Sequence, residues 1–282
     1  MKNLKLTLLA LLIGSAAFAQ IDTPAPSPSS TLIQDVGLTT VTIKYSRPSM
    51  KGRVIFGGLL AYGELWRTGA NSATKLTFSD DVTLGGNELK AGDYVILSVP
   101  GESEWKINLY PFDKAGVGGY FSKDPLAAST VKSEKLSSAV ESFTIDINSL
   151  KNNSATIDLT WENTKVSIPL TVNSDNKVMS QIADYDKNSK MQMANDYNGA
   201  ANYLLAEKKD LEKALSMSTK ATEIRPDAFW MMRTKSLIEA ELGKYKEAIA
   251  SAKLSLAAAE KAENKTYIDF NTASIAAWKK KK

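Results

Sequence analysis

The chain has 282 residues, a formal net charge of +4, and neither cysteine nor histidine. The lack of both residue types excludes disulfides, a Ser-His-Asp triad, a Cys-His pair and the usual zinc sites, so any catalysis would depend on carboxylates, lysine, tyrosine or a bound ion. The small net charge gives no reason to expect nucleic acid as a partner.

Residues 1–19 have the pattern of an export signal. Lys2 and Lys5 precede an apolar run at 6–13, and Ala17-Phe18-Ala19 is a small-x-small cleavage site. The run is too short to span a membrane, and no other segment approaches a spanning length. We therefore predict a signal peptide over 1–19, a secreted protein of the periplasm or the extracellular medium, and no transmembrane span.

An extended leader rich in proline and serine is expected over residues 20–31. Over 32–173 apolar and polar residues alternate, and turn signals such as Gly85-Gly86-Asn87 separate the apolar runs. Many short strands without helices between them predict an antiparallel β-sandwich or jelly-roll-like domain. A run that is apolar on both sides, at 94–99, predicts a central strand.

Two details of this β-region carry further expectations. Pro169 predicts that the last strand lies at an edge of a sheet, because proline cannot donate to a ladder. Between residues 113 and 135 the alternation fades, and we expect a long loop in which Tyr120 and Phe121 are either buried or offered to a ligand.

Over residues 174–282 the apolar period becomes that of helices. Residues 211–215 match residues 245–249 at an offset of about 34, which is the period of tetratricopeptide helical hairpins. Ala214 and Ala248 are equivalent small residues at which paired helices can approach closely. Two such hairpins are too few for a free-standing repeat, so flanking helices at about 175–185 and 266–278 are expected to complete a helical domain.

The candidate ligand site comes from two motifs, IKYSRPSMKGR at 43–53 and LWRTGAN at 65–71, which crowd four cations among aromatic residues and turn formers. Guanidinium groups that meet at such loops suit a carboxylate, phosphate or sulfate, and the aromatic rings suit a sugar or an aromatic group. In the alternative interpretation the arginines pair with Glu64, Asp80 or Asp81 and fasten the loops to the sheet. The ligand-binding residues we predict are Tyr45, Arg47, Lys51, Arg53, Trp66, Arg67 and Asn71.

No metal site and no cofactor are predicted. Asp184-x-Asp186-x-Asn188 has the opening spacing of a calcium loop, but Ser189 stands where glycine is needed and Asn195 where the bidentate glutamate belongs. The segment therefore indicates a connection between helices.

Four segments carry a family resemblance: IKYSRPSMKGRVIFG, AYGELWRTGANSATKLTFS, LKAGDYVILSVPGESEW and LTWENTKVSIPLTV. They resemble the secreted bacterial family catalogued as domain of unknown function 2911, and the helical tail is similar to the tail that many members carry. The resemblance implies an exported β-domain with helical repeats and no established activity. The chain departs from the family pattern between 113 and 128, where Gly118-Gly119 replaces a Trp-Gly pair and a common arginine is replaced by Leu126 or Ala127. If those groups line a pocket, the pocket of this chain is altered.

These patterns favour a non-catalytic binding protein, with an anionic or sugar-like ligand at the loops and a protein partner at the helical repeats. The apolar run at residues 229–232 is expected in the core between repeats, or else in a partner-binding groove. One alternative is a carboxylate-dependent hydrolase of envelope or polymeric carbohydrate, which would need two facing acids beside the arginines, one with a raised pKa. The other alternative is a purely structural scaffold.

Overall fold

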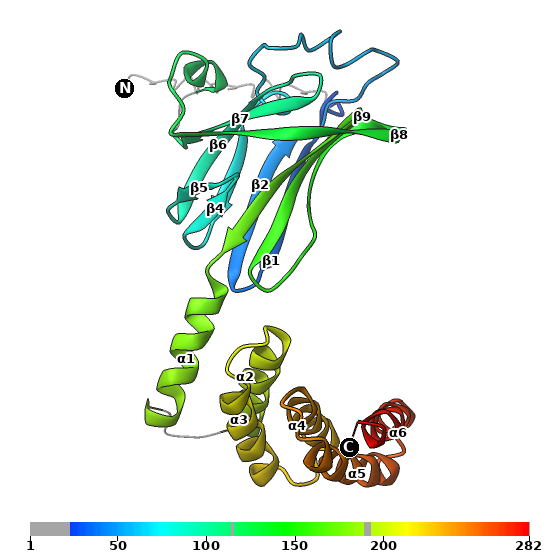
Figure 1. Cartoon of the computed structure of the whole chain (residues 1–282). Coiled ribbons are helices and arrows are strands. Elements are labelled where there is room, and N and C mark those ends of the chain that lie inside the picture. The colour runs from blue at the N-terminus through cyan, green and yellow to red at the C-terminus, as the bar shows by residue number, and fades with distance from the viewer. Residues whose placement is uncertain (1–22, 114–115, 189–192, 282) are drawn as a thin grey trace, which may run out of the picture. The chain divides into compact units, whose positions relative to one another are not determined.

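The computed structural model describes residues 23–113, 116–188 and 193–281. The predicted signal peptide lies outside the described residues. The chain divides into two compact units, with the boundary between Asn173 and Ser174. Strands occupy the first unit and helices the second, which confirms the predicted order of a β-region followed by a helical region (Figure 1).

The described residues of the β-unit form nine strands and one short 3-10 helix. All strand pairs are antiparallel, and the order across the sheet is β1-β2-β3-β6-β7-β8-β9-β4-β5. The elements are β1 (Ser29–Val36), β2 (Thr39–Ser46), β3 (Thr74–Phe78), β4 (Val82–Leu84), β5 (Asn87–Leu89), β6 (Gly92–Val99), β7 (Glu104–Pro111), η1 (Val117–Tyr120), β8 (Ala127–Asn148) and β9 (Ser154–Val172).

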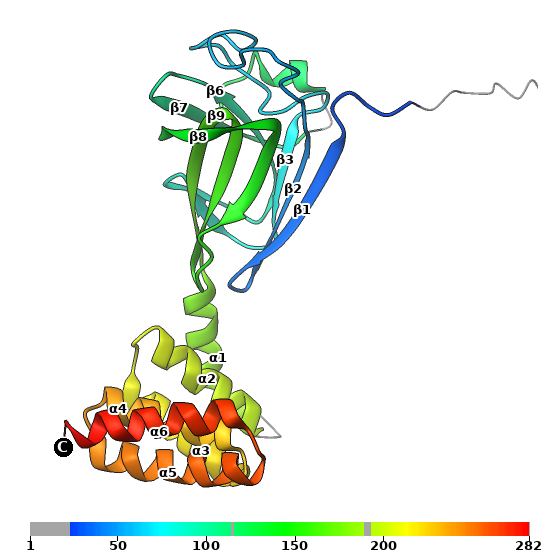
Figure 2. The same cartoon turned by 90° about the vertical axis from the view of Figure 1, so that its right-hand side faces the viewer.

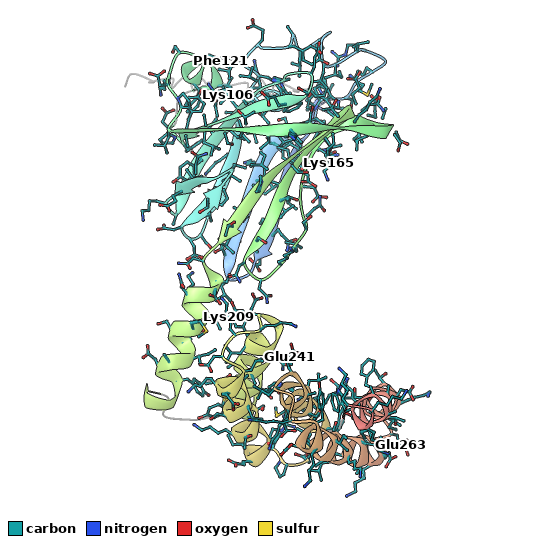
Figure 3. All side chains as sticks on the ribbon, viewed as in Figure 1. Lys106, Phe121, Lys165, Lys209, Glu241 and Glu263 are labelled. Atoms are coloured by element: carbon teal, nitrogen blue, oxygen red, sulfur yellow. The ribbon has the colours of Figure 1, made fainter. Side chains whose placement is uncertain are left out.

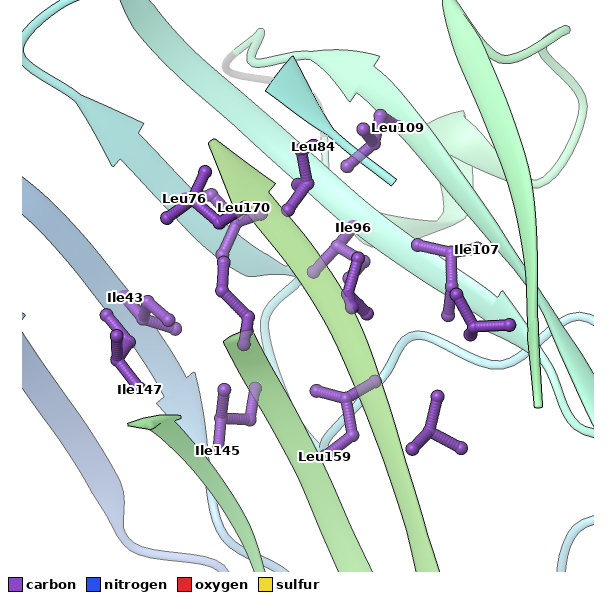
Figure 4. Packing of buried hydrophobic residues seen from close by; sticks show 14 of the residues in the cluster. Ile43, Leu76, Leu84, Ile96, Ile107, Leu109, Ile145, Ile147, Leu159 and Leu170 are labelled. Atoms are coloured by element: carbon purple, nitrogen blue, oxygen red, sulfur yellow. The ribbon is translucent and has the colours of Figure 1, made fainter. Parts of the chain in front are cut away.

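A bent strand makes this sheet sandwich-like. Residues 127–132 of β8 pair with β7, whereas residues from 133 onward pair with β9, so β8 passes from one face of the fold to the other (Figure 2). Apolar side chains of β2, β3 and β6 therefore meet those of β8 and β9 in one core (Figure 4). Burial of these faces is the main stabilising contribution in a chain without disulfides.

The central-strand prediction for residues 94–99 is confirmed, because β6 lies between β3 and β7. Ile96 belongs to the main core, whereas Val95 and Leu97 pack on the opposite face with Tyr110 and Tyr120. The predicted hairpin is also present, since Gly85 and Gly86 join β4 to β5 with φ of 56° and 85°.

Three details of the predicted β-region were wrong. β1 begins at Ser29, inside the expected leader, and β8 begins at Ala127, inside the expected loop. β9 is not an edge strand, because it pairs with both β8 and β4. Pro169 is tolerated there because it follows the stretch paired with β8 and precedes the stretch paired with β4, and its carbonyl accepts a hydrogen bond from Gly85 N at 2.8 Å.

The helical unit contains six helices among the described residues. They are α1 (Ser174–Asn188), α2 (Ala194–Ala206), α3 (Leu211–Ile224), α4 (Phe229–Glu241), α5 (Tyr245–Lys261) and α6 (Lys265–Lys279). The helices predicted at about 175–185 and 266–278 correspond to α1 and α6. None of the described helices is both long enough and apolar enough to cross a membrane.

Equivalent positions of the helical hairpins are buried at the predicted spacing. The pairs, about 34 residues apart, are Ala194 and Ala228, Tyr197 and Met231, Leu204 and Ile238, and Ala214 and Ala248. Small residues at such positions let the helices of a hairpin pack closely. The repeat therefore organises the packing of α2 to α5, while membership of the tetratricopeptide class stays a prediction.

Candidate ligand-binding cleft

Residues 47–73 connect β2 to β3 and contain most of both cationic motifs. Backbone hydrogen bonds fasten the connection to β8 and to β6. Met50 donates its backbone N–H to the carbonyl of Glu141 at 2.8 Å, and Trp66 exchanges two backbone hydrogen bonds with Ser98 of β6 at 2.8 and 2.9 Å. Both anchors hold the connection at one end of the β-unit (Figures 1 and 2).

The aromatic core of the β-unit reaches the surface beneath this connection. Trp66 is 8% exposed, and its ring stacks on Trp161 with centroids 5.9 Å apart and planes at 22°. Phe143 contacts the ring of Trp66 edge-on at 5.0 Å, and the indole Nε1 of Trp66 donates to the carbonyl of Gly69 at 3.1 Å. Trp66 is therefore a rigid floor residue whose orientation is set by the core.

The backbone of the connection takes unusual conformations at several points. Lys51, Thr68 and Asn71 have positive φ values of 50°, 54° and 56°, and Gly69 has a φ of 143°. Each non-glycine residue in the left-handed conformation lowers the stability of the fold by about 1–3 kcal/mol. The hydrogen bonds and packing around the connection must offset this cost. The same left-handed conformation occurs in turns elsewhere, for example at Lys208, so in this connection it marks sharp turns of the backbone.

A cleft of about 580 Å³ opens in these loops. Five of the seven predicted ligand-binding residues line it: Lys51, Arg53, Trp66, Arg67 and Asn71. The apolar part of the lining comes from Leu59, Leu60, Leu65, Phe121 and Trp161, together with two prolines. The lining contains no aspartate or glutamate among the described residues.

The three cations of the cleft form few hydrogen bonds with the protein. Arg53 donates from Nε to the carbonyl of Met50 at 2.8 Å and from one terminal nitrogen to that of Ser49 at 2.7 Å, whereas Arg67 donates to the carbonyl of Asn71 at 2.9 Å. Within the described part of the chain, no carboxylate oxygen lies within 4.0 Å of the side-chain nitrogens of Lys51, Arg53 or Arg67. No ion pair with a described residue therefore neutralises these three side chains.

The alternative of ionic staples does not hold in the form we expected. Asp81 pairs instead with Lys90 at 2.8 Å and accepts from the backbone N–H of Ala91 at 2.9 Å. The Lys90 ammonium lowers the pKa of Asp81, and the backbone N–H of Ala91 adds to this effect. Where arginines fasten the loops, they donate to backbone carbonyls and to one hydroxyl group, which carry no charge to balance theirs.

The structure places two of the predicted site residues elsewhere. Tyr45 is only 4% exposed, and its hydroxyl donates to the carbonyl of Ile145 and accepts from its N–H, so the ring belongs to the core and forms no wall of the cleft. Arg47 donates to the carbonyl of Phe143 at 3.0 Å and to Thr144 Oγ1 at 2.7 Å, and it does not line the cleft. Both residues join β2 to β8.

Several lining residues were absent from the sequence prediction. Trp161 was assigned only to a strand, and Leu59 had no sequence signal beyond its place in a loop. Phe121 follows η1 (Figure 3). Phe121 is 42% exposed, whereas the neighbouring Tyr120 is 1% exposed. The two predicted alternatives therefore each hold for one residue of this pair: Tyr120 is buried, and Phe121 lines the cleft. Phe121 also lies in the segment in which the chain departs from the family pattern.

Acidic residues near the cleft are engaged with backbone amides. Glu141 accepts from the backbone N–H of Lys51 at 2.9 Å, and Glu162 accepts from those of Ile55 and Phe56 at 3.3 and 3.4 Å. Burial raises the pKa of Glu239, but Glu239 lies in α4 of the helical unit and does not line the cleft.

The described residues contain no group of three or more acidic side chains that could hold a metal ion. Asp184, Asp186 and Asn188, which suggested the opening of a calcium loop, lie in the last turns of α1. The next residues, 189–192, lie outside the described part of the chain.

The fold and the cleft define the class of protein: an antiparallel β-domain with a cationic surface cleft, followed in the chain by a unit of helical hairpins. The chain belongs to the family described as "Protein of unknown function (DUF2911)", whose model matches residues 27–170, just over half of the chain. The matched region begins just before β1 and ends within β9, so it contains the whole cleft connection. No curated protein and no solved structure matches the chain.

Proposed function

We propose that this is an exported, non-catalytic binding protein whose β-unit holds an anionic ligand in the cleft. One observation carries the proposal: Lys51, Arg53 and Arg67 line one cleft in which the described lining includes no carboxylate. Like charges that line one cleft repel one another, and an anionic ligand relieves that repulsion. Arg67 retains Nε and a terminal nitrogen for a bidentate contact, since the hydrogen bond to Asn71 uses only the other terminal nitrogen.

The same lining argues against the two alternatives. A carboxylate-dependent hydrolase needs an acid and a base at the bound substrate, and the nearby Glu141 and Glu162 are occupied with backbone N–H groups. A scaffold with ionic staples would place a carboxylate against each guanidinium group, whereas the described arginines of the connection donate to carbonyl and hydroxyl oxygens.

Titration calorimetry of the exported form with inorganic sulfate tests the anion site. We expect weak binding that decreases with salt, because exposed charge interactions are screened. Arg67→Ala should lower the affinity for sulfate by about tenfold, because losing the hydrogen bonds between one guanidinium group and the anion reduces the binding free energy by that factor. The melting temperature should change little, because Arg67 makes a single hydrogen bond to a nearby carbonyl.

Arg225→Ala is the matched control for that experiment. Arg225 lies just after α3, its guanidinium carbon is 5.0 Å from the ring centroid of Trp230, and it does not line the cleft. The proposal is contradicted if neither inorganic sulfate nor an anion with an apolar tail binds, or if Arg67→Ala and Arg225→Ala bind alike.

For the helical unit we propose that an aromatic patch of α4 and α6 contacts a protein partner. Phe229 and Tyr267 have ring centroids 4.8 Å apart, Tyr267 and Phe270 are 6.2 Å apart, and Phe270 is 51% exposed. Arg233 lies over Phe270 at 5.2 Å. Aromatic and arginine side chains in contact are typical of interface hot spots. Within the apolar run at residues 229–232, Met231 is fully buried, as expected for a core residue, whereas Phe229 is partly exposed.

A photo-crosslinking amino acid at position 270 tests this second proposal in the producing cells. Position 254 in α5 is the control, because Leu254 is 63% exposed and belongs to none of these ring contacts. We expect a discrete crosslinked protein from position 270 alone. Equal products from both positions, or none from position 270, would contradict the proposal.

A further inference from the structure

The lining of the cleft has two chemically different parts. Lys51, Arg53 and Arg67 contribute positive charge, whereas Leu59 and Phe121 contribute apolar surface from two separate segments of the β-unit. Leu59 is 48% exposed and Phe121 is 42% exposed, so both leave much of their side chain in water. Large apolar side chains at a concave site gain stability when a ligand covers them.

Two neutral polar side chains of the lining already have partners within the protein. Asn71 Nδ2 donates to the carbonyl of Ser27 at 3.1 Å, and Ser49 Oγ is hydrogen-bonded to Ser142 Oγ at 2.9 Å. A sugar presents many hydroxyl groups, and each one that leaves water needs a new partner in the cleft. The described lining also lacks carboxylates that would accept from those hydroxyl groups. A neutral sugar would therefore find no carboxylate acceptor in the described lining, and it would not balance the charge.

A bare inorganic anion also matches only one part of the lining. It would satisfy the guanidinium groups but leave Leu59, Phe121 and the floor formed by Trp66 and Trp161 against water. The volume of about 580 Å³ is much larger than a single oxyanion, and it falls within the range usual for small organic ligands.

We infer that the cleft is selective for an amphiphilic anion, a small molecule in which one anionic group is joined to an aliphatic or aromatic body. The anionic group lies between Arg53 and Arg67, and the apolar body covers Leu59 and Phe121. This inference rests on the proposed anion-binding function and adds the chemical class of the ligand. It replaces the sugar-like ligand that the aromatic residues of the motifs suggested.

Three probes separate these possibilities by titration calorimetry on the full exported chain. They are sodium octyl sulfate below its micelle-forming concentration, sodium sulfate, and octyl glucoside, which has the same tail with a neutral sugar head. Octyl sulfate should bind at least about tenfold more tightly than sulfate, because burying even two methylene groups contributes that factor. Octyl glucoside should bind more weakly than octyl sulfate by a similar factor.

Phe121→Ala separates the apolar contact from the charge contact. It should weaken octyl sulfate binding several-fold and leave sulfate binding unchanged, whereas Arg67→Ala should weaken both. Phe112→Ala is the matched control, because Phe112 has the same 42% exposure as Phe121 and does not line the cleft. Circular dichroism melting of each variant establishes that the fold is retained.

The outcomes distinguish this inference from the proposed function. If sulfate binds as tightly as octyl sulfate, the selectivity for an amphiphile is overturned while the anion site stands. If octyl glucoside equals octyl sulfate, the anionic group contributes nothing to binding; if Phe121→Ala and Phe112→Ala behave alike, the tail is bound elsewhere. Either result overturns the inference. If no probe binds, both the inference and the proposed function fail.

Discussion

Arginine residues of the connection between β2 and β3 differ in what remains of their hydrogen-bonding capacity. Arg47 uses Nε and one terminal nitrogen on β8, and Arg53 uses the same pair of groups on its own turn, whereas Arg67 uses one terminal nitrogen. Arg67 therefore has the largest capacity left for a ligand. A cation cluster in a sequence does not show this difference, because it depends on which carbonyls lie within reach.

Tyr45 illustrates the same point for an aromatic residue. Its hydroxyl bridges the backbone N–H and carbonyl of Ile145 at 2.9 and 3.1 Å, in the interior of the β-unit. Tyr45→Phe should destabilise the protein by about 1–2 kcal/mol, because both buried groups of Ile145 lose that partner. Binding of sulfate or octyl sulfate should stay unchanged. Denaturant unfolding measures the stability. A loss of affinity without a loss of stability would show that Tyr45 is a ligand-binding residue after all.

At the scale of the element, the helices carry a buried ionisable group that does not serve the cleft. Glu239 in α4 is 5% exposed, and its Oε2 has no hydrogen-bond partner among the described residues. Burial raises the pKa of Glu239, with a smaller opposing contribution from Ser251. The folded protein therefore keeps the proton to a higher pH than the unfolded chain does.

This difference gives a pH dependence of stability with a defined sign. The contribution of Glu239 is most favourable below the ordinary pKa of glutamate, about 4.3, and it falls as the pH rises until the raised folded-state pKa is passed. Glu239→Gln should remove this fall and stabilise the protein near neutral pH by on the order of 1 kcal/mol. Unfolding measured across the acidic to neutral range checks the prediction. A variant that is less stable than the wild type near neutrality would show that the carboxylate is satisfied when charged.

For the whole molecule, the important feature is that each unit has its own core. The aromatic and aliphatic cluster of the β-unit lies within residues 36–172, and the helical clusters lie within residues 182–278. In the absence of disulfides, each unit is therefore stabilised by its own core, the first by packing within the sheet and the second by packing between helices.

A single substitution in the helical core tests whether the two cores unfold separately. Ala248 is fully buried in α5, and Ala248→Trp would overpack the contact with neighbouring helices by several heavy atoms. We expect a loss of about 1–3 kcal/mol or more in the helical unit. Calorimetry should show one transition at lower temperature and a β-unit transition that is unchanged. A shift of the entire unfolding profile would show that both cores melt together, and an unchanged profile would show that this interface is misplaced.

The sequence by itself determined the order of a β-region and a helical region, the central position of β6 and the spacing of the helical hairpins. These features follow from periodicities of two and 3.6, which depend only on how neighbouring side chains alternate between buried and exposed faces. The family resemblance at the two motifs was likewise available from the residues alone, and the family match over 27–170 confirms it.

Only the tertiary structure decided which side chains face the cleft. Tyr45 and Arg47 belong to the same motif as Lys51 and Arg53, yet the first pair turns to β8 and the second pair lines the cleft. Phe121 reaches the cleft from a segment far along the chain, because the loop after β7 lies at the same end of the β-unit. Such choices depend on long-range backbone contacts, such as those of Met50 with Glu141 and Trp66 with Ser98, which no local pattern encodes.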